Sequence, residues 1–371
     1  MFFLPKLLLL LNQVLYFLSI RLKYNSGGNE LSYKRRVLTG ITTSGIPHIG
    51  NLAGAILPAI EASKDPTTKS FLFLADYHSL IKNNDSDLTH TSSFDIAACW
   101  LACGLDHEKV IFYRQSDIPH IMELAWVLGC LTAKGLLNRA HAYKSAVSEN
   151  EAKNKKDSEK GITMGLFNYP ILMSADILIF NANIVPVGQD QKQHVEMTRD
   201  IASRFNHLYG EIFTIPEASI EKDKGILPGI DGRKMSKSYE NIIPIFLNKD
   251  ELRKKVMKIK TDSKEPGEPK NRENSTVFNL YRAFASAKDT EEFKKSFEEG
   301  ISWGEAKEIL FSLLEDSIRP YKENYQELIK DPLSLEKILL SGAEKALDIS
   351  LPIIKQVRKA VGIRSFGDIP K

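Results

Sequence analysis

Three short apolar runs that alternate with helical patterns constrain the fold more than any other feature of this sequence. The runs occupy residues 37–39, 71–76 and 110–114, and helix-like stretches separate them. Strands that are apolar throughout are typical of parallel sheets covered by helices on both faces. The pattern therefore predicts an α/β domain. Ligands of such domains bind beyond the carboxyl ends of the strands, so we expect a site in the segments that follow these runs.

The rest of the chain differs from this region in character. At 371 residues it exceeds the size at which one hydrophobic core usually suffices. The strand pattern fades after about residue 245, and Glu, Lys and Leu then recur at helical spacing in residues 276–287, 304–317 and 343–361. We expect the α/β domain to cover residues 35–245 and an all-helical domain to cover residues 246–371.

Two stretches are expected to lie outside these domains or at their surface. Residues 7–20 form an apolar run of 14 residues, and a polar spacer follows it. A membrane-spanning helix needs about 20 apolar residues, and no clear small-residue cleavage site follows the run. We therefore expect residues 1–34 to be an extension outside the fold, with no stable membrane association. Residues 146–161 are charged and show no period, so they predict an exposed loop.

Cysteines and net charge set further limits. Three cysteines are too few for a disulfide framework, which indicates a reducing compartment and hence a cytoplasmic location. Cys99 and Cys103 are four positions apart and are expected to be buried thiols on one helix face. No second pair of Cys or His follows at ligand spacing, so no metal site is predicted. A net charge of +3 neither requires nor excludes a nucleic-acid partner.

The first motif, TGITTSGIPHIGNLAGAI at residues 39–56, follows the first strand and precedes a helix. Its glycines, among them Gly40 and Gly50, allow backbone N–H groups and a helix N-terminus to approach a phosphate closely. The motif is neither G-x-G-x-x-G nor a Walker loop. Taken alone, it fits a structural turn as well as a nucleotide site.

The second motif, DGRKMSKSYEN at residues 231–241, combines two lysines with two hydroxyl groups. Flexible ammonium groups act as point charges on phosphate oxygens and can follow a triphosphate as its charge shifts. By composition alone the segment is a basic surface loop, which is the more common case. The pairing of this motif with the first one favours a nucleotide site.

Together, PHIGN at 47–51 and KMSKS at 234–238 resemble the paired signatures of the class I aminoacyl-tRNA synthetases. The resemblance implies a Rossmann-like catalytic domain, ATP with Mg²⁺, and a helical anticodon-binding domain. It departs from the usual H-x-G-H at Asn51, and at Thr42 and Thr43, where many bacterial relatives have Gln and Pro. The catalytic residues that it implies are Asn51, Lys234, Ser236 and Lys237. The ATP contacts that it implies are Thr42, Thr43, Ser44, Gly50, Asn51, Gly188, Gln189, Asp190, Ile226, Lys234, Met235, Ser236, Lys237 and Ser238.

A carboxylate lies within the apolar segment ILMSADILIF, which Pro170 is expected to open as the first helical residue. An unpaired buried charge is costly, so Asp176 must have a partner. An arginine, a lysine or a backbone N–H of the protein is the more common partner. Met173 shares the helix face of Asp176, and a thioether beside a carboxylate suits an indole ring with one N–H donor.

From Asp176 through VPVGQDQ, the sequence closely resembles the tryptophanyl branch of these synthetases. The resemblance implies that Asp176 receives the indole N–H and that ATP ribose and adenine contact residues 188–190. Asp190 and Gln193 also match a capping box for the next helix, so Asp190 is expected to be structural, functional or both. The pocket that the resemblance implies is lined by Gly40, Met173, Val185, Val187 and Gln191.

The activity implied is a tryptophan–tRNA ligase that forms tryptophanyl-adenylate and then charges tRNA(Trp). A homodimer is expected by resemblance. The alternatives are a tyrosyl-tRNA synthetase, a nucleotidyltransferase and a non-catalytic RNA-binding paralogue. No acid–base role is assumed for His48. The tRNA is expected to contact basic residues of the helical domain, which could equally be solvated faces: Arg253, Lys254, Lys255, Lys258, Lys355, Arg358 and Lys359.

Overall fold

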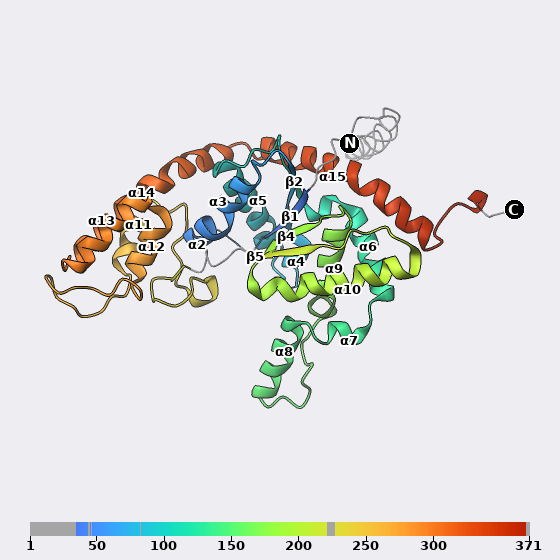
Figure 1. The fold of residues 1–371 in the computed structure, drawn as a ribbon, viewed down its shortest axis with the longest axis horizontal. Coiled ribbons are helices and arrows are strands. Elements are labelled where there is room, and N and C mark those ends of the chain that lie inside the picture. The colour runs from blue at the N-terminus through green and yellow to red at the C-terminus, as the bar shows by residue number, and fades with distance from the viewer. Residues whose placement is uncertain (1–34, 44, 46, 82, 221–226, 369–371) are drawn as a thin grey trace, which may run out of the picture. The chain divides into compact units, whose positions relative to one another are not determined.

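A parallel sheet forms the centre of the compact unit that begins at Arg35 (Figure 1). The computed structural model describes residues 35–368, except residues 44, 46, 82 and 221–226. In the described part, every strand pairs in parallel with its neighbours, in the order β3-β2-β1-β4-β5. The strands are β1 Arg35–Thr42, β2 Thr68–Ala75, β3 Ile111–Arg114, β4 Ile184–Val187 and β5 Glu217–Ile220. The predicted α/β fold is confirmed.

Helices cover both faces of this sheet and continue beyond it (Figure 1). Those that follow the first strands are α2 Ile49–Asn51, the π-helix η1 Leu52–Ile56, α3 Leu57–Ala62, α4 Asp76–Ser79, α5 Ser86–Ala102, the 3₁₀ turn η2 Gln115–Asp117 and α6 Pro119–Leu131. Next come α7 Lys134–Leu137, α8 His141–Ala152, α9 Met164–Leu178, η3 Gln189–Gln191, α10 Lys192–Tyr209 and η4 Lys237–Tyr239. The last are α11 Lys249–Met257, α12 Thr276–Phe284, α13 Ala287–Glu298, α14 Trp303–Leu328, α15 Pro332–Ala360 and η5 Phe366–Asp368.

Side-chain alternation along β2 explains why residues 71–75 of this strand are all apolar. Leu72 and Leu74 belong to a buried cluster with α3 and α5 on one face, whereas Phe71 and Phe73 belong to a second cluster with α6, α9 and α10. Successive residues of a strand point to opposite faces, so a strand covered on both sides needs apolar residues at every position.

The strand order reverses beside β1. The chain runs from β1 outward to β2 and β3, and then crosses to the other side of β1 to form β4 and β5. Val37 of β1 pairs with Ile184 of β4. Ligands of parallel sheets bind at such a switch point, outside the carboxyl ends of the strands. The topology therefore places the expected crevice between the ends of β1 and β4.

Helices α11 to α14 form the helical region that the sequence predicts after residue 245. One apolar cluster runs from α5 into these helices, and Tyr325 of α14 donates a 3.0 Å hydrogen bond to Asp95 of α5. The apolar core thus continues across residue 245, and the domain boundary there stays a prediction. Cys99 and Cys103 are buried free thiols in this cluster, as expected. No described helix is long and apolar enough to cross a membrane.

Helix α15 returns to the edge of the sheet and packs on β3. A Cβ atom on Gly342 would lie 1.7 Å from the Phe112 carbonyl oxygen, so only glycine allows this backbone approach. An ion pair of 2.6 Å between Arg114 and Glu336 adds a second link between β3 and α15. The end of β3 is therefore held by the carboxyl-terminal helix.

The structure corrects the expected start of α9. The helix begins at Met164, and Thr163 caps it by accepting a 3.2 Å hydrogen bond from the Leu166 amide. Pro170 lies inside the helix and is not its first residue. Proline lacks the N–H that would donate to the carbonyl four residues earlier, so the helix tolerates it at the cost of one bond. Because proline is common in the first turn of a helix, the interior Pro170 made the sequence indicate a helix start later than the true start after Thr163.

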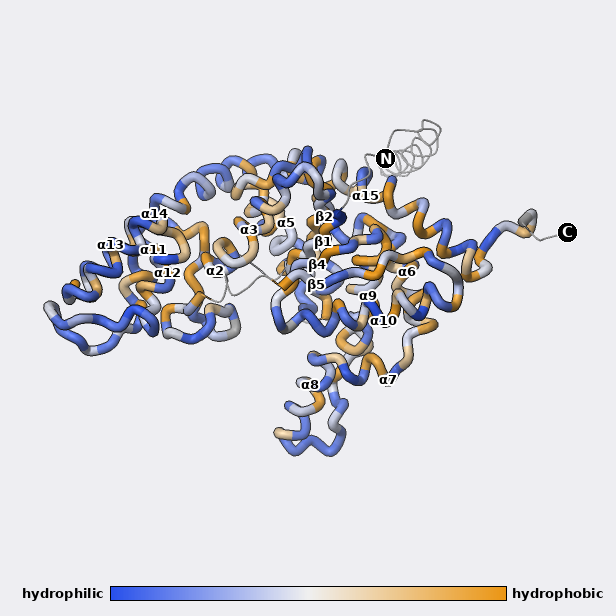
Figure 2. Tube along the Cα trace, viewed as in Figure 1, coloured by the Kyte–Doolittle hydropathy of each residue, from blue (hydrophilic) through white to orange (hydrophobic). Residues whose placement is uncertain are grey.

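The loop expected at residues 146–161 is partly helical. Helix α8 extends to Ala152, and the turns after it are largely hydrophilic (Figure 2). The buried Asn150 amide donates to the carbonyls of Ser158, at 2.8 Å, and Lys160, at 3.0 Å. One buried asparagine fixes the return of the chain, and such a single contact leaves no periodic pattern in the sequence.

The capping box expected from Asp190 and Gln193 is also wrong. Helix α10 begins after Gln191, and the Gln191 side chain does not cap it. The Gln193 amide instead accepts from the His141 backbone N–H and donates to the Arg139 carbonyl, each at 3.0 Å. The Gln193 side chain, which the local pattern predicts to be part of a capping box, therefore makes a tertiary contact with the start of α8 and the residues before it. The apolar spacing along α10 is confirmed, because Val195, Thr198, Ile201 and Phe205 are buried.

Candidate active site

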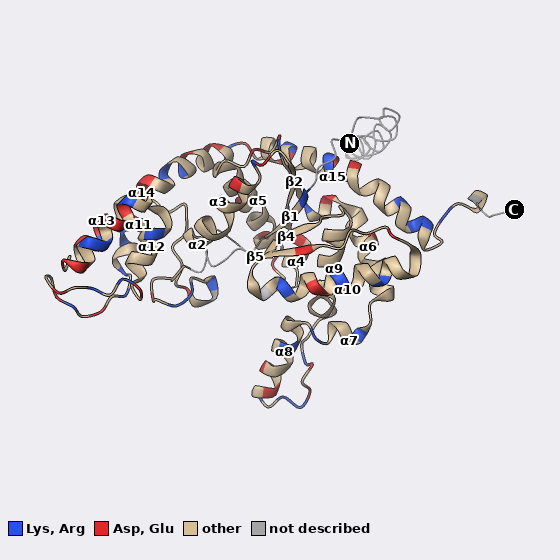
Figure 3. Cartoon of the chain, in the orientation of Figure 1, with Lys and Arg blue, Asp and Glu red and all other residues tan. Residues whose placement is uncertain are grey.

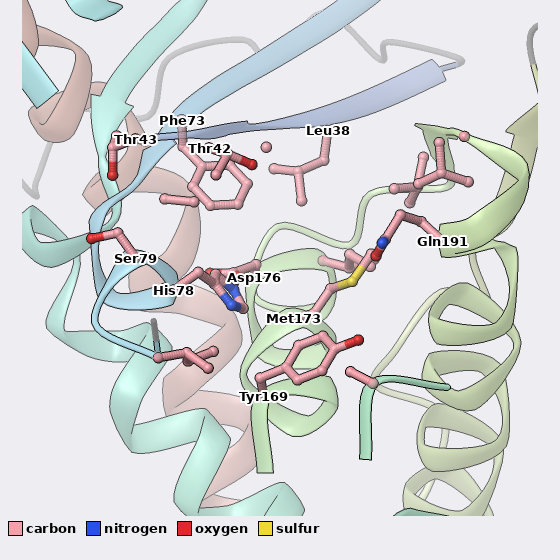
Figure 4. A pocket seen from close by; sticks show the side chains of 18 of the residues that line it. Leu38, Thr42, Thr43, Phe73, His78, Ser79, Tyr169, Met173, Asp176 and Gln191 are labelled. Carbon is pink, nitrogen blue, oxygen red and sulfur yellow. Dashed lines mark hydrogen bonds and ion pairs between the residues drawn. The ribbon is translucent and has the colours of Figure 1, made fainter. Parts of the chain in front are cut away.

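A cavity of about 790 Å³ opens where the topology places the crevice (Figure 4). Its size is typical of small-molecule sites. β1 contributes Gly40 and Thr42, and β4 contributes Val185 and Val187. The residues expected to bind the amino acid all line it: Gly40, Met173, Asp176, Val185, Val187 and Gln191. The structure therefore brings together residues from four separate segments, β1, α9, β4 and η3, that the resemblance had assigned to one pocket.

Asp176 is the most deeply buried charged group of this cavity, with 1% of its surface exposed. Its Oδ1 accepts a 2.7 Å hydrogen bond from Gln115 Nε2, and its Oδ2 lies 2.8 Å from His78 Nε2. Burial raises the pKa of the carboxyl, and the bonds from His78 and Gln115 oppose that rise. The partner of the carboxylate in the described protein is therefore an amide and an imidazole, not an arginine or lysine.

Aromatic and polar residues that sequence reasoning missed complete the cavity. Phe73 and Tyr169 line it together with His78 (Figure 4). Gln115 does not line the cavity but donates a hydrogen bond to Asp176. The sequence did contain a signal for His78, because this residue lies three positions after the end of β2, and ligands of parallel sheets bind beyond the carboxyl ends of strands. Gln115 likewise directly follows β3.

The first motif folds into a tight turn followed by α2. His48 caps α2: its Nδ1 accepts from the Asn51 amide at 3.3 Å, and Asn51 Oδ1 accepts from the His48 amide at 3.1 Å. Gly45 has a positive φ of 82°, a conformation that favours glycine. Burial and the nearby charge of Lys237 lower the pKa of His48 to about 4. The capping role of His48 requires its neutral ring.

The second motif lies against the first. Residues after it pair with the turn, because the Ile49 amide donates to the Ile243 carbonyl at 3.0 Å and the Ile245 amide donates to the Pro47 carbonyl at 3.2 Å. A Cβ atom on Gly45 would lie 3.5 Å from Lys237 Nζ. The two signatures, far apart in sequence, therefore meet at one place.

Asn241 holds the base of the second motif. Its Oδ1 accepts from the Ser236 amide at 2.8 Å, and its Nδ2 donates to Asp231 at 2.7 Å and to the Lys234 carbonyl at 3.0 Å. The bond from Asn241 is the largest cause that lowers the pKa of Asp231 to about 2, and Arg233 adds to it. Asn241 is buried, and sequence reasoning did not single it out.

The residues expected to contact ATP fall into three groups. Thr42, Thr43 and Gly188 line the cavity, whereas Gly50, Asn51, Gln189 and the described residues of KMSKS do not. Met235 is buried under the first motif, Lys237 is half-buried, and burial lowers its pKa; Lys234 is exposed. Ser44 and Ile226 lie outside the described residues, as do the side chains of Asp190 and Ser238.

Comparison with known proteins places this site in a family. Residues 32–317 match the family described as tRNA synthetases class I (W and Y). The sequence is 54% identical to the tryptophan–tRNA ligase of Neisseria meningitidis over 89% of this chain and 98% of the relative. It is 56% identical to that of Pseudomonas aeruginosa over 90% of this chain and 75% of the relative. The chain belongs to the tryptophanyl-tRNA synthetases.

Solved structures agree with this membership of the tryptophanyl-tRNA synthetase family. The Campylobacter jejuni tryptophanyl-tRNA synthetase, complexed with ADP and tryptophan, aligns with a TM-score of 0.79 and 39% identity over 88% of this chain and 99% of that chain. A tyrosyl-tRNA synthetase from Aeropyrum pernix aligns with a TM-score of 0.60 at 19% identity, over 83% of this chain and 89% of that chain, which shows the fold alone.

The described residues of this family member contain no group of three or more His, Cys, Asp or Glu side chains that could hold a metal ion. Mg²⁺ in nucleotide sites is commonly bound by substrate phosphates and water, with few protein ligands. The residues present therefore fit Mg²⁺ only as a companion of the ATP phosphates.

Proposed function

We propose that the chain joins L-tryptophan to tRNA(Trp) with ATP. The observation that carries the proposal is the meeting of the two signature segments beside a cavity that buries the carboxylate of Asp176. In the first step, a carboxylate oxygen of tryptophan forms a bond to the α-phosphorus, and pyrophosphate leaves. In the second step, a ribose hydroxyl of the tRNA takes the acyl group and AMP leaves.

Asp176 is the proposed acceptor for the indole N–H. An ionised carboxylate offers about four lone-pair positions, and the protein donors occupy one on each oxygen. A third donor therefore does not require Asp176 to lose a partner. Met173, Val185 and Val187 supply apolar surface for the ring, and Gln191 supplies a polar group at the opposite end of the cavity (Figure 4).

Lys234 and Lys237 are proposed to stabilise the departing pyrophosphate, together with backbone N–H groups of the first motif. Phosphoryl transfer depends mainly on positioning and charge stabilisation, so no covalent enzyme intermediate is needed. Mg²⁺ bound to the phosphates would add positive charge there. Ser236 and Asn51 are proposed to act by keeping these segments in place. The Ser236 amide binds Asn241 at the base of the second motif, and Asn51 binds His48 at the start of α2.

Thr43 supports the placement of ATP at the end of β1. Its hydroxyl is buried, with 1% of the residue exposed, lines the cavity, and has no hydrogen-bond partner among the described residues. A buried hydroxyl without a partner costs free energy, so a ligand oxygen is the expected partner. This agrees with the expectation that Thr42 and Thr43 contact ATP.

The tRNA is proposed to contact basic residues of the helical region. Figure 3 shows Lys and Arg on α11 next to acidic residues of the neighbouring helices. Arg253 pairs with Glu308 and Arg358 pairs with Glu123, which leaves Lys254 and Lys258 as better candidates for phosphates. Lys254→Ala should weaken tRNA binding and reduce its salt dependence by about one phosphate contact. Unchanged salt dependence would remove this residue from the interface.

A homodimer is proposed through the outer face of α6. Trp126 is 76% exposed and Met122 is 45% exposed, and Cys130 continues the same helix face at the same spacing. Exposed apolar faces of this kind mark protein interfaces. Sedimentation of a Trp126→Lys variant tests this, because the variant should remain monomeric at concentrations where the parent is dimeric. The expected cytoplasmic location rests on the three free cysteines and stays a prediction.

The proposed activity is tested by pyrophosphate exchange with tryptophan, with tyrosine and without an amino acid. A pocket that hydrogen-bonds its substrate can discriminate by about 10⁴-fold against an analogue that lacks the polar group, so we expect exchange with tryptophan alone. Preference for tyrosine would support the tyrosyl alternative. No exchange with either amino acid would support a non-catalytic paralogue.

A further inference from the structure

Gln115 is fully buried and does not line the cavity, yet it contacts the carboxylate that does. It is the first residue of η2 and directly follows β3. β3 lies next to β2, whose end continues into α4 and His78. Because parallel strands end at the same edge of the sheet, Gln115 and His78 approach Asp176 from two neighbouring strand ends.

Gln115 and His78 each bind a different oxygen of the Asp176 carboxylate. Gln115 Nε2 donates to Oδ1 at 2.7 Å, and His78 Nε2 lies 2.8 Å from Oδ2. One donor on each oxygen fixes the rotation of the carboxylate plane, and with it the direction of the remaining lone pairs. An ionised carboxylate can only accept hydrogen bonds, so Asp176 orients the Gln115 amide with its nitrogen toward the carboxylate.

The turn that carries Gln115 is itself held in place. Asp117, in the same turn, binds Arg114 Nε at 2.9 Å, and Arg114 pairs with Glu336 of α15. Gly342 of α15, six residues after Glu336, contacts the backbone of β3. A residue anchored in this way can hold a ligand group in one orientation, since its supporting contacts resist rotation.

We infer that Gln115 is a positioning residue that aims Asp176 at a ring N–H and so sets the preference for tryptophan over an isostere without that donor. The inference rests on the proposed function, because it takes tryptophan as the occupant of the cavity. Gln115 acts through Asp176 and touches no substrate itself. Removal of its amide would leave Oδ1 without a donor and would allow the carboxylate to turn.

The test compares two amino acids in full-length protein by pyrophosphate exchange. L-Tryptophan has a ring N–H, and 3-(1-benzothiophen-3-yl)-L-alanine has sulfur in its place with nearly the same shape. The parent protein should prefer tryptophan by at least about tenfold in kcat/KM, the effect of a hydrogen bond to a charged group. Gln115→Met should lower this ratio about tenfold, mainly through KM for tryptophan, with KM for ATP unchanged.

A pH profile adds a readout that a merely structural role would not move. Gln115 donates to the ionised carboxyl, and this bond lowers the pKa of Asp176 against the effect of burial. Its loss should move the acid limb of kcat/KM for tryptophan to higher pH. The limb for the sulfur analogue should not move, because that substrate has no N–H for the carboxylate to accept.

Gln193→Met is the matched control. Gln193 also makes two hydrogen bonds, to the backbone of Arg139 and His141, but it does not line the cavity and does not contact Asp176. The ratio of kcat/KM for tryptophan to kcat/KM for the sulfur analogue should be the same in Gln193→Met as in the parent. Should Gln115→Met fail to fold, as judged by circular dichroism, Gln115→Asn provides the same comparison with an amide one methylene too short to reach Oδ1.

Two results would overturn the inference. If the parent prefers tryptophan but the Gln115 variants lose activity equally with both substrates, Gln115 does not position the acceptor, and the proposed function stands. If the parent shows tryptophan-dependent exchange without preference over the sulfur analogue, the acceptor role of Asp176 fails as well. Absence of tryptophan-dependent exchange would instead remove the proposed function itself, and the inference with it.

Discussion

The wall of the cavity formed by α9 and β4 buries the carboxylate of Asp176, whereas the second signature segment carries an exposed charge on Lys234. Asp176 is 1% exposed and has a donor on each oxygen. Lys234 is exposed, and the loop that carries it depends on the hydrogen bonds of Asn241. Recognition of a side chain needs a fixed shape, while stabilisation of a moving phosphate charge needs groups that can follow it.

The largest expected effect lies on the phosphate side. Lys237→Ala should reduce the rate of tryptophan activation by about 10²- to 10³-fold, because one charge that stabilises the transition state is lost. Equilibrium binding of tryptophan should not change. Pyrophosphate exchange and fluorescence titration measure the two effects, with Lys288→Ala, an exposed lysine of α13, as the control. Equal losses in both measurements would contradict the division between the two sides.

The second effect lies on the buried side. Asp176→Asn should raise KM for tryptophan by about tenfold to a hundredfold with a smaller change in kcat, because a hydrogen bond to a charged group contributes about 1.5–3 kcal/mol. Asp176 is proposed to accept the indole N–H and not to contact the reacting phosphate, so the loss should be one of binding. Steady-state kinetics in both substrates would show it, and a fall in kcat with constant KM would contradict it.

A third change tests the base of the loop. Asn241→Ala removes the hydrogen bonds that Asn241 makes with the Ser236 amide and the Lys234 carbonyl, and it should raise KM for ATP about tenfold. Tryptophan binding should be unaffected, since Asn241 does not line the cavity. Kinetics at varied ATP and a thermal unfolding curve separate a local effect from general destabilisation. An equal change in KM for both substrates would show that the two sides are coupled.

The smallest expected effect is a pH dependence of folding stability that arises from His48, where the two signature segments meet. The pKa of His48 is lowered from 6.5 to about 4, so the unfolded chain binds a proton more readily than the folded one between these values. The stability from neutral His48 is complete above pH 6.5 and is lost as pH falls through about 4. Asn can cap α2 without titrating, so His48→Asn should show a smaller loss of stability over this range in urea unfolding. Parallel curves for the two proteins would contradict the assignment.

The positions of the strands could be predicted from the sequence because they depend on local patterns. Residues 71–75 are apolar throughout, and this is the requirement for a strand covered on two faces. The two signature segments were also recognisable, since their glycines and lysines occur in short contiguous stretches. That Asp176 needed a partner followed from one carboxylate within an apolar helix.

Only the tertiary structure decided which residues satisfy these requirements. The partners of Asp176 are Gln115, 61 positions away, and His78, 98 positions away. The hydrogen bonds of Asn241 to the second motif, and the Thr163 cap that starts α9, are likewise individual side-chain contacts. Such contacts have no period along the chain, because the order of the strands, and not their sequence spacing, determines which strand ends become neighbours. The sequence thus determined that a buried acid would need a partner, and the adjacency of the ends of β2 and β3 in the sheet decided how the acid is held.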